Sequence, residues 1–204
     1  TKRGIGPCYG DKVSRVGLRV CDLYHPDYLA QSLKFNVEYI NKTLMHPFGE
    51  KPLTFADLYE EYLEYGKRLQ PFVRDTVYEL NFAVKTGASV LFEGAQGALL
   101  DIDFGTFPFV TSSSCAGGGV FSGSGVSVGR LDGVIGIAKA YTTRVGTGPF
   151  PTELTDETGE FLRAEGGEFG ATTGRPRRCG WLDLVVLRYS AMLSGVTRVG
   201  LTKL

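Results

Sequence analysis

The sequence predicts an α/β fold with a mostly parallel sheet, flanking helices and long functional loops. Helix-type and strand-type patterns alternate along the chain, which is typical of this class. A β-type run at residues 89–93 leads directly into Gly94-Ala95-Gln96-Gly97, and a strand that ends in a Gly-rich turn is where open α/β sheets place ligands. Residues 103–130 are rich in Gly and Ser without a repeating pattern, which indicates a functional loop or a disordered linker.

Helices are expected in the first part of the chain, where apolar residues recur three or four positions apart. One covers residues 27–44 and stops near a proline and a glycine. The next opens at Thr54, which with Asp57 resembles a capping pair. Another covers residues 73–84 and ends at Gly87, a residue suited to a left-handed helix cap.

In the second part of the chain, the sequence pattern predicts further strands and helices in alternation. A buried strand is expected at residues 134–141 and a final strand from Arg198. Helices are expected at residues 157–163 and 181–193. The latter begins with a tryptophan that we expect in the core, and Gly195 caps it.

Composition narrows the functional classes. Lysine plus arginine and aspartate plus glutamate both number 22, so the formal net charge is zero, which argues against a nonspecific nucleic-acid binder. No apolar run approaches the ~20 residues of a membrane span and no signal-like segment opens the chain, so we expect no membrane partner. The four cysteines are scattered, which favours free thiols in a reducing cytoplasm over disulfides or zinc.

The most informative stretch is the Arg-rich segment at residues 170–178, Gly-Ala-Thr-Thr-Gly-Arg-Pro-Arg-Arg. Arginine can bind carboxylate or phosphate oxygens in pairs, and glycines let backbone amides approach the same oxygens. The segment by itself would fit a solvated basic turn equally well. The chain has neither a Walker loop nor a Rossmann fingerprint, so spacing alone supports an anionic small-molecule site in an α/β protein.

Other polar residues give weaker signals. The two histidines, His25 and His46, are interpreted as ordinary surface or core residues, because no catalytic partner stands near them in the sequence. Asp101 and Asp103 share one face if their segment is extended. They could bind a cation, but hydrogen bonds that hold the loop are the favoured interpretation.

Several longer motifs follow one another along the whole chain. They are TKRGIGP (1–7), LFEGAQG (91–97), LLDID (99–103), VTSS (110–113), AYTTRVG (140–146), PFPTE (149–153), GATTG (170–174) and CGWLD (179–183). In sequence and in order they resemble the adenylosuccinate synthetase family. This family joins IMP to L-aspartate in a GTP-dependent reaction through 6-phosphoryl-IMP, the first committed step to AMP.

The resemblance implies roles for particular residues. The positions that match IMP-binding residues are Thr1, Arg15, Gln96, Thr111, Val145 and Arg175. Among them, Arg15 matches an arginine that reaches the IMP phosphate of the other subunit of a homodimer. The positions that match the aspartate-binding loop are Ala171, Thr172, Thr173, Gly174, Arg175, Pro176 and Arg177. Arg177 and Lys203 match positions on the GTP side, and Lys203 begins the guanine-recognition motif.

The resemblance also sets expectations for the whole fold and for catalysis. It implies a P-loop-NTPase-like fold incomplete at both ends, with residues 1–204 as the central part of a single domain. The family's phosphate loop, catalytic Asp and catalytic His, with the ligands of Mg²⁺, are expected to precede Thr1, and the rest of the guanine site to follow Lys203. No catalytic or metal-ligating residue is therefore expected among these 204 residues, and alone they are expected to be inactive.

Two departures from the family pattern stand out. Pro176 lies inside the aspartate loop where a basic residue is expected, and Gly10 lies where polar residues are common. Both flanking arginines of Pro176 are present, so both changes are interpreted as tolerated. The alternative to an enzyme is a non-catalytic module for nucleotide and dicarboxylate binding or for oligomerisation.

Overall fold

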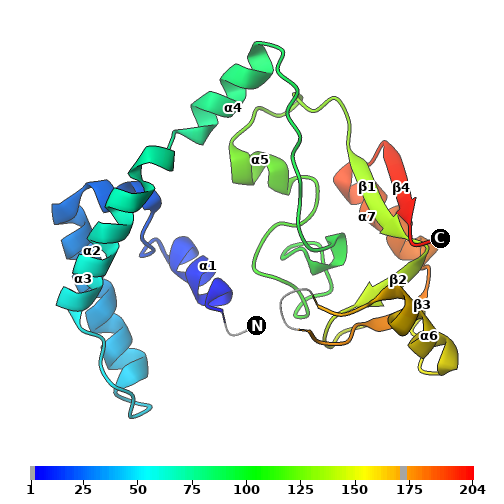
Figure 1. The fold of residues 1–204 in the computed structure, drawn as a ribbon, viewed down its shortest axis with the longest axis horizontal. Coiled ribbons are helices and arrows are strands. Elements are labelled where there is room, and N and C mark those ends of the chain that lie inside the picture. The colour runs from blue at the N-terminus through cyan, green and yellow to red at the C-terminus, as the bar shows by residue number, and fades with distance from the viewer. Residues whose placement is uncertain (1–2, 171–173) are drawn as a thin grey trace. The chain divides into compact units, whose positions relative to one another are not determined.

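A computed structural model describes residues 3–170 and 174–204 (Figure 1). By its internal contacts the chain divides into two compact units, one that ends at Asp75 and one that comprises Thr76–Leu204. Within the described ranges, no helix combines the length and the apolar character needed to cross a membrane.

The first unit is helical. Its elements are α1 (Ile5–Ser14), η1 (Val20–Tyr24), α2 (Pro26–Ile40), the π-type turn η2 (Asn41–Met45), α3 (Phe55–Leu69) and η3 (Gln70–Phe72). Helix α2 buries Leu29, Leu33 and Val37, which stand four residues apart and so form one stripe of the helix. In α3, a Cβ added to Gly66 would lie 3.2 Å from the Leu23 side chain and carbonyl, so this glycine lets α3 approach η1 closely.

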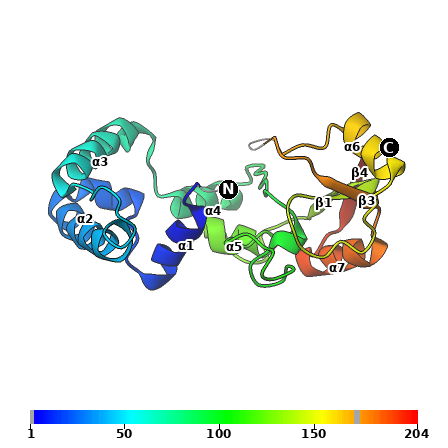
Figure 2. The same cartoon turned by 90° about the horizontal axis from the view of Figure 1, so that it is seen from below.

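The second unit is of mixed α/β type. Its elements are α4 (Thr76–Lys85), η4 (Ala98–Leu100), α5 (Gly119–Ser124), β1 (Ile135–Lys139), β2 (Tyr141–Arg144), α6 (Glu157–Gly166), β3 (Arg178–Trp181), α7 (Leu184–Ser194) and β4 (Arg198–Thr202). Strands β1 and β4 pair in parallel, whereas β2 and β3 pair antiparallel. Ala140 is the single residue between β1 and β2, and its amide donates to the carbonyl of Thr202, so the two pairs adjoin. Figure 2 shows α6 beside β3, which it contacts.

The α/β class is confirmed, and so are the predicted helices. Helix α2 falls in the first predicted helical range, and α3 and α4 in the next two. Gly87 and Gly195 take the left-handed conformation at the ends of α4 and α7, with φ of 84° and 62°. The predicted strands at 134–141 and from Arg198 correspond to β1 and β4.

Several local predictions are wrong. Residues 89–93 form no strand with any described residue, because a strand needs a hydrogen-bonded neighbour. Leu91 within this run is 89% exposed. Trp181 lies in β3, 58% exposed, instead of opening the next helix in the core. That helix begins at Leu184, where Asp183 accepts hydrogen bonds from the amides of Val185 and Val186.

Other local details also differ from the sequence analysis. Thr54 stands at the N-cap of α3, but its side chain accepts no capping hydrogen bond from the described residues. Helix α5 lies within residues 103–130, which were expected to form a loop or linker, and α1 was not predicted. The antiparallel pair of β2 and β3 was not predicted, since each strand is only four residues long and its partner is distant in sequence.

Candidate functional site

On either side of residues 171–173, the Arg-rich segment forms two hydrogen-bonded stems, called here the Arg-rich hairpin. The amide of Gly170 donates to the carbonyl of Arg175 at 2.8 Å, and the amide of Gly174 donates to the carbonyl of Gly170 at 2.8 Å. Phe169 and Pro176 form an antiparallel bridge beneath them. The predicted aspartate-loop residues Ala171, Thr172 and Thr173 lie outside the described residues. The two stems of the loop are therefore fixed by backbone hydrogen bonds.

A buried carboxylate lies beside the hairpin stems. The side chain of Glu168 is only 2% exposed. Its Oε2 accepts hydrogen bonds from Lys139 Nζ at 2.7 Å and Arg177 Nη1 at 2.8 Å, and its Oε1 accepts one from the Tyr141 hydroxyl at 2.5 Å. We refer to Lys139, Tyr141, Glu168 and Arg177 as the Glu168 cluster. It joins β1, β2 and both stems of the Arg-rich hairpin.

Electrostatics keeps Glu168 charged and Tyr141 protonated. Burial favours a raised pKa for Glu168, but the hydrogen bonds from Lys139 and Tyr141 and the charge of Lys139 outweigh it, so the pKa lies below its ordinary value. Burial and the hydrogen bond to Glu168 raise the pKa of Tyr141 to about 12. The cluster contains two cations and one carboxylate, so it keeps a net positive charge next to the loop.

Arg177 is held at several points. Its backbone amide donates to the Glu168 carbonyl at 2.9 Å, and its own carbonyl accepts a hydrogen bond from Arg163 Nε at 3.0 Å. The guanidinium reaches Glu168, as described above, while 28% of the side chain stays exposed. A guanidinium carries five N–H donors in a rigid fork. Arg177 can thus bind an anion while it remains bonded to Glu168.

Arg178 has a different environment from its neighbour. Its guanidinium forms a two-pronged ion pair with Glu153, in which Nε lies 2.7 Å from Oε1 and Nη2 contacts Oε2. Its Nη1 donates to the carbonyls of Gly146 and Gly148 at 3.1 and 2.9 Å. The hydrogen bond from Arg178 lowers the pKa of Glu153. Arg178 therefore holds the turn that follows β2.

The segment 96–116 is organised around Asp101, which is 1% exposed. Its Oδ1 accepts hydrogen bonds from the amides of Asp103 and Phe104 at 3.0 and 3.1 Å, and its Oδ2 from those of Cys115 and Ala116 at 2.7 and 2.9 Å. Burial favours a raised pKa for Asp101, but these amides lower it below its ordinary value. The interpretation that this carboxylate holds the loop is confirmed.

The predicted IMP residues Gln96 and Thr111 lie within this same segment. Gln96 is exposed, has a φ of 64° and accepts a hydrogen bond from Cys115 Sγ at 3.4 Å on its Oε1. The amide of Thr111 donates to the carbonyl of Leu100 at 2.8 Å. Asp101 is adjacent to Leu100 and bonded to Cys115, so one carboxylate fixes the surroundings of both predicted residues.

Arg144, at the end of β2, ties that strand to the same segment. Its Nη2 donates to Thr106 Oγ1 and to the Phe109 carbonyl, both at 2.9 Å, and its Nε donates to the Thr147 carbonyl at 3.1 Å. The next residue, Val145, is exposed. Arg144 thus ties the end of β2, next to Val145, to the segment that carries Gln96 and Thr111.

The remaining predicted residues belong to other elements of the chain. Arg15 belongs to the helical unit, where it ends α1 in the left-handed conformation and is exposed. Lys203 follows β4, and its Nζ donates to the Gly166 carbonyl at the end of α6 at 2.7 Å. Arg175 and Gly174 lie in the hairpin stem, both exposed. Thr1 lies outside the described residues.

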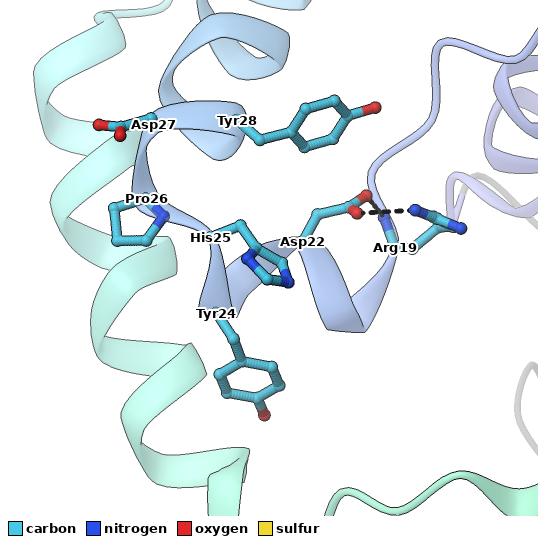
Figure 3. Close-up of a pocket in the computed structure, with 7 residues that line it drawn as sticks. All are labelled: Arg19, Asp22, Tyr24, His25, Pro26, Asp27 and Tyr28. Atoms are coloured by element: carbon cyan, nitrogen blue, oxygen red, sulfur yellow. Dashed lines mark hydrogen bonds and ion pairs between the residues drawn. The ribbon is translucent and has the colours of Figure 1, made fainter.

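The helical unit contains a pocket of about 580 Å³ (Figure 3). It is lined by Arg19, Asp22, Tyr24, His25, Pro26, Asp27 and Tyr28, and no predicted site residue belongs to this lining among the described residues. Arg19 donates to Asp22 from its backbone amide at 2.8 Å and from its guanidinium at 3.1 Å. These bonds cap η1, so Arg19 and Asp22 serve the local turn.

A metal site was tested against the described residues. Residues 3–170 and 174–204 contain no group of three His, Cys, Asp or Glu side chains that could hold an ion. Both carboxylate oxygens of the buried Asp101 already accept backbone amides. The described residues therefore contain no preformed protein cage for a metal ion.

Sequence reasoning missed the acidic partners of the arginines. Glu168, Glu153 and Arg144 were not singled out. A charged residue next to a predicted helix usually faces solvent, and only the pairing of β2 with β3 brings these groups together. One signal for these carboxylates was available in the sequence. Three arginines lie close together in a chain with no net charge, and clustered positive charges need carboxylates nearby.

Comparisons with known proteins agree with one another. The family model for adenylosuccinate synthetase matches residues 1–204. Adenylosuccinate synthetases of Thermoanaerobacter sp. (strain X514) and Caldanaerobacter subterraneus subsp. tengcongensis are 55% and 54% identical over 100% of this chain and 48% of their own length. The structure of fully ligated adenylosuccinate synthetase from Plasmodium falciparum matches with a TM-score of 0.90 and 40% identity, over 99% of this chain and 47% of that one. The chain thus spans about half the length of these relatives.

Proposed function

Because the chain belongs to the adenylosuccinate synthetase family, we propose that the protein that carries it joins IMP and L-aspartate to form adenylosuccinate in a GTP-dependent reaction. The observation that supports this most directly is the Arg-rich hairpin, in which the buried Glu168 holds Arg177. Clustered guanidiniums suit a dicarboxylate and phosphate-bearing nucleotides. The reaction belongs to purine nucleotide synthesis, and we place the protein in the cytoplasm. Residues 1–204 would form the central part of a single domain.

Substrate-binding roles are assigned to the predicted residues on the hairpin and the neighbouring loops. Gln96, Thr111, Val145 and Arg175, with Thr1, would bind IMP. The residues that would bind aspartate are Ala171, Thr172, Thr173, Gly174, Arg175, Pro176 and Arg177. The positive charge of the Glu168 cluster supports this assignment, because a dicarboxylate brings two negative charges to the loop.

GTP, metal and subunit contacts complete the proposal. Arg177 and Lys203 would lie on the GTP side. Mg²⁺ would be the cofactor, with ligands other than the described residues. Arg15, exposed at the end of α1, would reach the IMP phosphate of a second subunit in a homodimer.

The test is product formation by the purified native protein. With IMP, aspartate, GTP and Mg²⁺ present, chromatography should show adenylosuccinate, and omission of any one component should abolish it. Binding of IMP and aspartate by calorimetry without turnover would instead support the non-catalytic module. Absence of both turnover and binding would contradict either function.

A further inference from the structure

We propose that Glu168 is a positioning residue that holds Arg177 in the orientation needed to bind the dicarboxylate substrate. The inference rests on the function proposed above and adds a role for a residue that itself touches no substrate. It comes from the geometry of the Glu168 cluster, in which one buried carboxylate joins two strands and both stems of the Arg-rich hairpin.

Glu168 accepts two hydrogen bonds from Arg177. Its backbone carbonyl accepts the Arg177 amide at 2.9 Å, and its Oε2 accepts Arg177 Nη1 at 2.8 Å. Arg163 Nε fixes the Arg177 carbonyl from a third side, at 3.0 Å. A long side chain that is bonded at both its backbone and its head group loses most of its rotamer freedom before a ligand arrives. Binding then costs less ordering entropy.

The position of the carboxylate is itself fixed by other elements. Lys139 at the end of β1 donates to the same Oε2 at 2.7 Å and to Thr143 Oγ1 on β2 at 2.9 Å. Tyr141 on β2 donates to Oε1. Both oxygens are therefore held by β1 and β2, and the place where Arg177 Nη1 must lie follows from these strands rather than from the loop.

Replacement of Glu168 by glutamine would isolate the contribution of the carboxylate charge to holding Arg177. Glutamine keeps nearly the same shape, but it removes the charge and places one NH₂ group against donors that need an acceptor. Arg177 then loses its charge-assisted bond and can adopt other rotamers, while the backbone pairing of the hairpin persists. The predicted defect is thus weaker capture of the dicarboxylate, without loss of the chemical step.

The experiment compares Glu168→Gln with Asp156→Asn in the native protein. Asp156 caps α6 by accepting the Gly159 amide at 3.2 Å, and asparagine caps helices equally well. This control removes the same charge at the start of α6, whereas Glu168 follows the end of that helix. We expect Glu168→Gln to raise the KM for aspartate about tenfold or more, with kcat at saturating aspartate within about threefold, while the control keeps both within about twofold.

An aspartate KM within twofold of wild type in folded Glu168→Gln would overturn the inference. If that variant is recovered only as aggregate, Tyr141→Phe takes its place, because it removes only the donor to Oε1. A rise in the aspartate KM above twofold in that variant supports the role, and a smaller change overturns it. Wild-type protein without any turnover would contradict the proposed function instead, so the two failures are distinguishable.

Discussion

Asp101→Asn is the substitution expected to damage the candidate IMP site most without touching a predicted ligand residue. The wild-type carboxylate accepts four backbone amides, two on each oxygen. Asparagine keeps one acceptor oxygen and turns an NH₂ group toward the other two amides. These two amides then remain buried without an acceptor.

The magnitude follows from those two lost bonds. Leaving a buried donor unsatisfied costs about 1–3 kcal/mol, and hydrogen bonds to a charged acceptor are at the stronger end of the range. We therefore expect the free energy of opening of the segment 96–116 to fall by about 2–6 kcal/mol. Because Gln96 and Thr111 depend on this segment, the KM for IMP should rise as well.

Native-state hydrogen exchange is the suitable assay, because it measures opening of the segment itself and not of the whole chain. The amides of Cys115 and Ala116 should lose most protection, since both donate to the altered side chain. The matched control is Asp103→Asn, which changes an exposed carboxylate two positions away and should alter the opening free energy by less than about 0.5 kcal/mol. A loss below about 1 kcal/mol in Asp101→Asn would refute the reasoning.

The pH dependence of stability gives an independent check that the charged form of Asp101 stabilises the segment. The folded-state pKa of Asp101 lies below the ordinary value of 3.8. A carboxylate with a depressed folded pKa contributes stability above its unfolded pKa and loses that contribution as the pH falls through the folded pKa. The difference between wild type and Asp101→Asn should therefore be full at neutral pH and shrink below about pH 3.8.

Three further substitutions test other parts of the structure. Arg177→Lys should raise the KM for aspartate about 10- to 150-fold, a loss of about 1.5–3 kcal/mol, because lysine cannot form paired bonds with a carboxylate; steady-state kinetics would have to show a change of less than twofold to contradict this. Arg15→Leu should raise the KM for IMP, and mixing it with subunits disabled at Gln96 should restore some activity if the two residues serve one shared site. No recovery in mixtures shown to exchange subunits would dismiss that site. Gly180→Ala should destabilise the antiparallel pair by about 1–3 kcal/mol or more, because the added Cβ would overlap the Thr152 carbonyl; an unchanged melting temperature would speak against that close approach.

Much of the helical structure could be predicted from the sequence because its causes are local. The stripe of Leu29, Leu33 and Val37 is visible as a spacing of four, and the glycines that end α4 and α7 are short-range signals. The pairing of β2 with β3 has no such local cause. Its register joins Tyr141 to Trp181, and each four-residue strand is too short to show an alternating pattern.

The candidate site could be predicted only in part for the same reason. The motifs around Gln96, Thr111 and the Arg-rich hairpin name residue types suited to anions. They do not show that Glu168 lies under the hairpin, since its partners Lys139 and Tyr141 come from strands far back in the sequence. A buried ion cluster is a tertiary property, and its members look like ordinary surface residues until the sheet is formed.

The neighbouring arginines show how far a sequence cluster can differ from a spatial one. Successive side chains of an extended segment point to opposite faces, so Arg177 and Arg178 cannot face one ligand from the same side. Arg177 accordingly pairs with Glu168, while Arg178 pairs with Glu153 and holds the turn after β2. Two adjacent, chemically identical residues thus have different partners because an extended segment points them to opposite faces. Arg177 is on this basis the arginine of the pair through which the hairpin can bind an anion, and Arg178 the one that keeps the neighbouring loop in place.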